Sequence, residues 1–126
     1  FYGLQVVDIS DPEHPQIVGS VNTPGFAHGV AITGTYACVA DRAFGLQVID
    51  VSDPENPQIS GSVDTPGQAY GVAISGHHAY VADDASGLQV VDIAMPTNPR
   101  VVAAVNTAGF AHGVTVSGMF AYVADS

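Results

Sequence analysis

Gly3-Leu4-Gln5-Val6-Val7-Asp8-Ile9 is the stretch that decides the fold, because it returns twice at a fixed spacing. It recurs from Gly45 to Val51 and from Gly87 to Ile93 with few changes, so the period is 42 residues in a chain of 126. A repeat of about 40–45 residues is the length of one four-stranded propeller blade. The sequence therefore predicts an all-β β-propeller fold, with three blade equivalents in the chain.

Each unit is expected to hold four short strands separated by turns. In the middle of the chain we expect strands at 29–32, 36–40, 46–51 and 58–63. The first three are apolar at odd and even positions alike, whereas a sheet with one wet face alternates. We therefore expect neighbouring blades to cover both faces. The fourth strand contains Gly, Ser and Gln, as suits an outer strand at the rim.

The two ends of the chain are expected to fall inside a blade rather than between blades. We expect residues 1–23 to hold the outer two strands of one blade and residues 111–125 the inner two, with whole blades at about 27–65 and 69–107. Three blades are too few for a ring, since propellers use about four to eight. Following Ser126 with Phe1-Tyr2 also restores the three-residue spacer of the interior units. We therefore expect a head-to-tail homodimer with six blades; the alternative is a slice of a longer chain.

The composition excludes two classes of partner. The chain has twelve acidic residues and only two basic ones, Arg42 and Arg100. This balance argues against binding to nucleic acid or to anionic membrane surfaces. No stretch is long and apolar enough to cross a bilayer. Solubility explains the acidity more simply than a cation-binding role. The single cysteine, Cys38, is expected to be a small buried apolar residue.

The repeated runs resemble the LVIVD repeat over essentially the whole chain. The runs that carry the resemblance start at Leu4, Leu46 and Leu88, each followed in the same unit by Tyr-Val-Ala-Asp or a close variant. The resemblance implies a bacterial or archaeal β-propeller, secreted or displayed on the cell surface, and it implies no activity. The third unit has Ala94-Met95-Pro96 in place of Ser-Asp-Pro, so we expect a looser turn there. With no initiator Met and no signal peptide, we expect a processed product, a fragment or an excised piece from which the targeting signal is missing.

Carboxylates recur at the ends of two strands in every unit. Such carboxylates could bind Ca²⁺, but the spacing of an EF-hand is absent. Strict recurrence favours capping of turns through nearby backbone N–H groups. The expected turn-capping residues are Asp8, Asp50 and Asp92 after the third strand and Asp41, Asp83 and Asp125 after the second.

His28, Tyr70 and His112 share one repeat position, just before the innermost strand. In a propeller this position lies near the mouth of the central channel, and a ring of two chains would bring four His and two Tyr together there. Converging imidazoles can bind Zn²⁺. The favoured alternative is an aromatic lining with hydrogen bonds to backbone. We therefore expect no cofactor, with Zn²⁺ at His28 and His112 or Ca²⁺ as the alternatives.

No catalytic motif is present. The chain lacks a Gly-x-Ser-x-Gly elbow, a glycine-rich phosphate loop and any lysine. The pair Asp83-Asp84 is too isolated for acid–base work across a cleft. We expect a non-catalytic scaffold or interaction module. The alternatives are a small-molecule or metal-binding module at the channel mouth, and the remnant of an enzyme whose catalytic blades lie elsewhere.

Overall fold

The computed structural model describes residues 3–126, so Phe1 and Tyr2, two of the three residues of the expected spacer, lie outside the described residues. Residues 3–126 form twelve strands in four antiparallel sheets, which confirms an all-β fold built of propeller-like blades. The first two sheets comprise β1 (Gly3–Asp8) and β2 (Gln16–Asn22), then β3 (Gly29–Thr33), β4 (Tyr36–Ala40), β5 (Leu46–Asp50) and β6 (Gln58–Val63). The last two comprise β7 (Gly71–Ser75), β8 (His78–Ala82), β9 (Leu88–Asp92) and β10 (Arg100–Val105), then β11 (Ala111–Ser117) and β12 (Phe120–Asp125).

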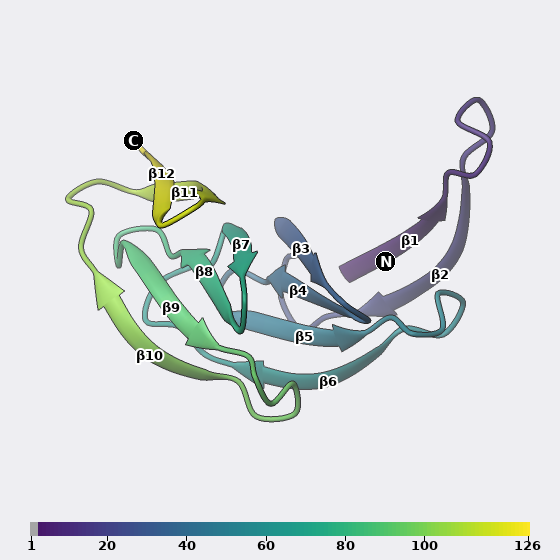
Figure 1. The fold of residues 1–126 in the computed structure, drawn as a ribbon, viewed down its shortest axis with the longest axis horizontal. Helices are drawn as coiled ribbons and strands as arrows, with labels where there is room; N and C mark the ends of the chain where they lie inside the picture. The colour runs from purple at the N-terminus through teal and green to yellow at the C-terminus, as the bar shows by residue number, and fades with distance from the viewer. Residues whose placement is uncertain (1–2) are drawn as a thin grey trace.

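The sheets follow one another along an open arc (Figure 1). β3 and β7 lie on its inner side, and β2, β6 and β10 lie on its outer side. The two four-stranded sheets have the spatial orders β3-β4-β5-β6 and β7-β8-β9-β10, so consecutive strands are neighbours. The two-stranded sheets β1-β2 and β11-β12 lie at opposite ends of the arc.

The strands follow from the local sequence. Val, Ile and aromatic residues suit the pleated, covered surface of these strands. Gly34, Gly76 and Gly118 adopt positive φ of 57°, 59° and 59° in the two-residue turns that join the inner hairpins. Such turns need glycine or a residue that tolerates this conformation. The observed strands differ from the expected ones by a residue at most, since β3 extends to Thr33 and β5 ends at Asp50.

The second sheet, β3-β4-β5-β6, is covered on both faces. On one face, Cys38 and Val48 pack with Val81 and Val91 of the following sheet in a single buried cluster. On the other face, Ile49 and its neighbours Ala37 and Val39 pack against Leu4 and Val21 of the preceding sheet. Adjacent residues of one strand therefore point into two different interfaces, which is why these strands are apolar at successive positions.

The turn at Met95 keeps the backbone geometry of its counterparts. The amide of Asn98 donates to the carbonyl of Met95 at 2.9 Å, and the equivalent bonds to Asp11 and Asp53 are both 3.0 Å. The expected loosening is therefore absent from this backbone bond. The third unit lacks only the side-chain bonds, such as that from Asn56 to Asp53 at 2.9 Å.

Candidate functional site

His28, Tyr70 and His112 lie in a row at the beginning of the inner strands β3, β7 and β11. The ring centroids of His28 and Tyr70 are 4.9 Å apart with an edge-to-face angle of 85°. Those of Tyr70 and His112 are 4.5 Å apart at 40°. The backbone holds the row in place, because the amides of His28 and Tyr70 donate to the carbonyls of Ala40 and Ala82 at 2.9 Å. The structure thus joins the three residues into one continuous aromatic row, in which the two histidines are exposed and Tyr70 is half-buried.

Two charged residues border this aromatic row. Arg42 lies with its guanidinium carbon 5.4 Å from the Tyr70 ring centroid and donates two hydrogen bonds to Gln68 Oε1, at 3.1 and 2.8 Å. Asp84 Oδ1 lies 3.2 Å from His112 Nε2. Both residues have positive φ, 49° and 55°, and both form a backbone bridge to the next unit, at Ala69 and Ala111. The aromatic row therefore has a cation beside its tyrosine and an anion beside its last histidine.

Sequence reasoning gave Arg42 no role and treated Asp84 as part of an isolated acidic pair. A signal was available. Arg42, Asp84 and Ser126 are equivalent, since each follows the repeated Val-Ala-Asp, and they carry three different side chains. A position that varies within an otherwise regular repeat is where units acquire different chemistry.

The aspartates after the third strand bond to the backbone close by. Asp8, Asp50 and Asp92 each accept a hydrogen bond from the amide two residues later, at 2.8, 2.9 and 2.9 Å. The bonds from the Ser10 and Ser52 amides hold the pKa of Asp8 and Asp50 below the ordinary value of 3.8. These carboxylates are engaged in local turns.

The aspartates after the second strand have different partners from those expected. Asp41 accepts a bond from Thr23 Oγ1 at 2.6 Å and another from the Gly25 amide at 2.9 Å. The partners lie 18 and 16 residues earlier, in the loop that leaves the outer strand of the preceding sheet. The prediction of nearby backbone partners is therefore wrong for Asp41, because this carboxylate joins one sheet to the next.

The same bridge recurs in the other two units. Asp83 accepts bonds from Thr65 at 2.5 Å and Gly67 at 2.8 Å, and Asp125 accepts from Thr107 at 2.6 Å and Gly109 at 3.0 Å. The local-capping prediction is wrong for Asp83 and Asp125 as well. Burial raises the pKa of Asp83, the two hydrogen bonds oppose that rise, and the nearby charge of Asp84 adds to it. These three aspartates hold adjacent sheets together.

Within residues 3–126, no group of three or more His, Cys, Asp or Glu side chains has the geometry of a metal site. Tyr70 separates the two histidines of the aromatic row. Cys38 is buried, and its burial raises the pKa of the thiol to about 11. Its position, facing the following sheet, suits a packing residue.

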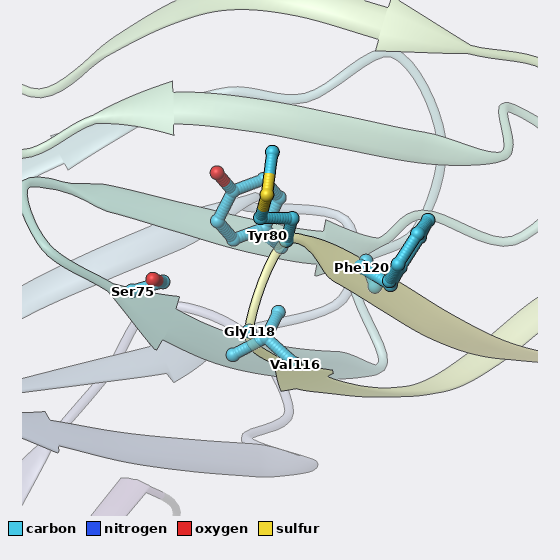
Figure 2. A pocket seen from close by; sticks show the side chains of 7 residues that line it. Ser75, Tyr80, Val116, Gly118 and Phe120 are labelled. Carbon is cyan, nitrogen blue, oxygen red and sulfur yellow. The ribbon is translucent and has the colours of Figure 1, made fainter.

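A small hollow of about 100 Å³ lies where the β11–β12 hairpin meets β7 and β8 (Figure 2). Most of its lining is apolar or glycine, and Ser75 and Tyr80 supply the polar side chains. An enzyme site usually gathers several polar groups in a cleft that holds most of a ligand. This hollow offers neither the size nor the set of groups.

The comparisons with known proteins identify the repeat. The family profile described as the LVIVD repeat matches residues 2–23, 24–65, 66–107 and 108–126. The comparison with curated proteins gave no match. Across residues 3–126, no helix has the length and apolar character needed to cross a membrane. Since the repeat profile covers the chain from residue 2 to residue 126, the chain belongs to the LVIVD-repeat family.

Proposed function

We propose that the chain is a non-catalytic scaffold that closes head to tail with a second copy into a ring of six blades. The observation that carries this proposal is that the two terminal sheets are complementary halves of one blade. β11-β12 corresponds to the inner half of a four-stranded sheet and β1-β2 to the outer half, in the strand order of the two complete sheets. β12 of one chain would pair with β1 of the other.

The register of that pairing follows from the complete sheets. Cys38 pairs with Val48 in one, and Tyr80 pairs with Val90 in the other. One period on, Tyr122 would pair with the partner's Val6. Tyr122 is 56% exposed, whereas at the equivalent positions of the complete sheets Cys38 is fully buried and Tyr80 is partly buried. The unpaired edge therefore exposes groups that the complete sheets bury.

The sheet faces exposed at the two ends of the arc are also complementary to each other. At one end the inner strand β3 exposes Val30 and Ile32, which are 53% and 61% accessible, whereas Val72, the counterpart of Val30, is 9% accessible. At the other end the outer strand β10 exposes Val105 at 58%, although its counterpart Val63 is partly buried. One end lacks an inner half-blade and the other lacks an outer half-blade. These are the two halves that a second copy brings.

Glycines on the inner strands support the same contact. A Cβ on Gly29 would lie 2.8 Å from the carbonyl oxygen of Tyr70, and one on Gly71 would lie 2.9 Å from that of His112. Gly113 is the third equivalent, and a Cβ there would meet nothing nearer than the Cβ of Ala124 at 3.6 Å. Within a single chain, Gly113 has no close neighbour that requires glycine. In the ring, the carbonyl of the partner's His28 would be that neighbour.

The outer strands fit less closely at the junction, the contact between one chain and its partner. A Cβ on Gly19 or Gly61 would lie 2.0 or 2.4 Å from the carbonyl oxygen of Pro54 or Pro96 in the following blade. The third equivalent is Ala103, which carries that Cβ and would face the partner's Pro12. The rim must therefore separate locally at each junction, so the inner strands and the β12–β1 pairing would supply most of the contact.

A second candidate function, binding of a small molecule or metal ion at the channel mouth, is favoured by the aromatic row and its neighbour Asp84. The two functions are compatible, because a ring would bring two such rows together. What supports a role without catalysis is the regularity of the three units, because a catalytic site needs a local group of side chains that differs from its surroundings.

Cross-linking across the proposed junction tests the register. With Cys38 replaced by Ala, Val6→Cys and Tyr122→Cys in one chain should form a disulfide between chains under mild oxidation. The matched control places the second cysteine at Phe120, whose expected partner is Asp8 and whose distance to residue 6 is too great for a disulfide. Cross-linked dimer from the first variant alone supports the proposal. Equal cross-linking of both variants, or none in either, contradicts it.

A further inference from the structure

We propose that each junction of the ring holds a transition-metal site made by His112 and Asp84 of one chain and His28 of the partner. The inference rests on the proposed ring, since the site is incomplete in one chain. Two identical junctions give two sites per ring. The probe that best fits the donors is Zn²⁺, because two imidazole nitrogens and a carboxylate oxygen form a common protein ligand set for this ion.

The spacing of the aromatic row places two histidines side by side only at the junction. Neighbouring members of the row are 4.9 and 4.5 Å apart between ring centroids. In the ring, the residue that follows His112 at the same repeat position is the partner's His28. Inside one chain each histidine has Tyr70 as its neighbour, and Tyr70 offers no imidazole nitrogen.

Asp84 supplies the third donor. Its Oδ1 lies 3.2 Å from His112 Nε2. A tetrahedral zinc ion with ligand bonds of about 2.1 Å separates neighbouring donor atoms by about 3.4 Å. The two atoms therefore already lie near the spacing of two corners of a zinc coordination shell. Water can take the fourth corner, as it does in zinc sites with three protein ligands.

The local charges favour a cation at the junction over one at Tyr70. Arg42 lies against the Tyr70 ring, 5.4 Å from its centroid, and would repel a metal ion there. At the equivalent position beside His112 stands Asp84, close enough to Asp83 for their charges to interact. The chain carries a formal net charge of −10, which raises the local concentration of cations. From one unit to the next, the charged neighbour changes from the cation Arg42 to the anion Asp84, and the ring changes from the phenol of Tyr70 to the imidazole of His112.

Mixed rings test whether the site lies between chains. Native mass spectrometry with added zinc chloride should show two Zn²⁺ per wild-type dimer. Dimers made only of His28→Ala chains, or only of His112→Ala chains, should bind none, because each junction then lacks one imidazole. A dimer of one His28→Ala and one His112→Ala chain, prepared by co-expression with different tags, should bind one. One junction of that dimer retains both histidines and the other retains neither.

Two further variants define the ligands. Asp84→Asn should weaken zinc binding at least 10-fold while leaving the metal-free dimer intact. His77→Ala, in the exposed turn before β8, is the control and should leave both zinc ions bound. Zinc bound by the single-variant dimers, or a mixed dimer that binds none or two, would overturn the inference. A metal-free wild-type dimer that binds no zinc would overturn the site and leave the ring intact, whereas a metal-free monomer would overturn the ring itself.

Discussion

Thr23 donates a 2.6 Å hydrogen bond from Oγ1 to Oδ1 of Asp41, and this bond joins consecutive blades. Thr23 follows the outer strand of one sheet, while Asp41 directly follows the second strand of the next, and both are buried. The same pair recurs as Thr65–Asp83 and Thr107–Asp125. Blades are therefore held together by a repeated polar contact in addition to apolar packing.

We expect Thr65→Val to destabilise the chain by about 1–3 kcal/mol, because it leaves the buried Asp83 carboxylate without one of its two partners. Thr107→Val removes the equivalent bond to Asp125, which is exposed in the single chain, and water can replace the hydroxyl there. Urea unfolding under conditions that keep the chain monomeric compares the two variants. Equal losses of stability would contradict this interpretation of the bridge.

The aspartates should titrate on opposite sides of the ordinary pKa of 3.8. Burial raises the pKa of Asp83, so its contribution to stability is fully present below pH 3.8 and is lost as the pH rises through the folded-state pKa. The pKa of Asp8 and Asp50 is lowered, so their contribution is present above pH 3.8 and is lost as the pH falls through their folded-state values. Carboxyl carbon shifts measured by NMR against pH give all three values. The reverse order would contradict the assigned environments.

Cys38 should not react with thiol reagents while the chain is folded. The thiol is fully buried and its pKa is about 11, so at pH 8 it presents almost no thiolate. A disulfide reagent should modify Cys38 only after unfolding in urea, at a rate similar to that of a free thiol. Fast labelling of the folded chain at pH 8 would show that the interface between the two complete sheets opens readily.

Gly113→Ala should weaken the dimer while leaving the single chain folded. Its added Cβ has space within one chain but would approach the partner's backbone as closely as a Cβ on Gly71 would approach His112, at 2.9 Å. Gly71→Ala is the matched comparison, because its clash lies inside the chain and should lower the stability of the chain itself. Sedimentation velocity over a dilution series, with thermal unfolding alongside, separates the two effects. A Gly113→Ala dimer as tight as wild type would argue against contact between the inner strands.

Ala103→Gly should tighten the dimer. Gly19 and Gly61 stand at the equivalent contacts inside the chain, where a Cβ would lie 2.0 and 2.4 Å from a carbonyl oxygen. The substitution removes the Cβ that would make the same clash with the partner. Glycine in a strand costs about 0.5–1 kcal/mol in chain stability, so a lower melting temperature of the monomer can accompany the stronger association. The dissociation constant from sedimentation equilibrium is the deciding quantity. Weaker association would show that residue 103 does not face the partner.

The sequence predicted the blades well because the 42-residue period places equivalent residues at equivalent points of the backbone. Apolar residues at successive positions, such as Val48 and Ile49, indicated coverage on both faces, and the two residues do pack in different clusters. The repeat position shared by His28, Tyr70 and His112 likewise indicated that these side chains form a group.

Contacts between blades were harder to predict. The partners of Asp41 lie 16 and 18 residues away, and their approach depends on how two sheets stack rather than on any local pattern. The roles of Arg42 and Asp84 were missed for a related reason. Each reaches a ring in the next unit, which only the curvature of the arc brings within contact.

The mass of the metal-free chain at low concentration tests the central claim most directly. If exposed half-blades at the two ends complete one another, native mass spectrometry of a dilute sample should show a species of twice the 12.9 kDa chain mass and no larger closed form. A stable species of 12.9 kDa, with no dimer as the concentration is raised, would contradict the account.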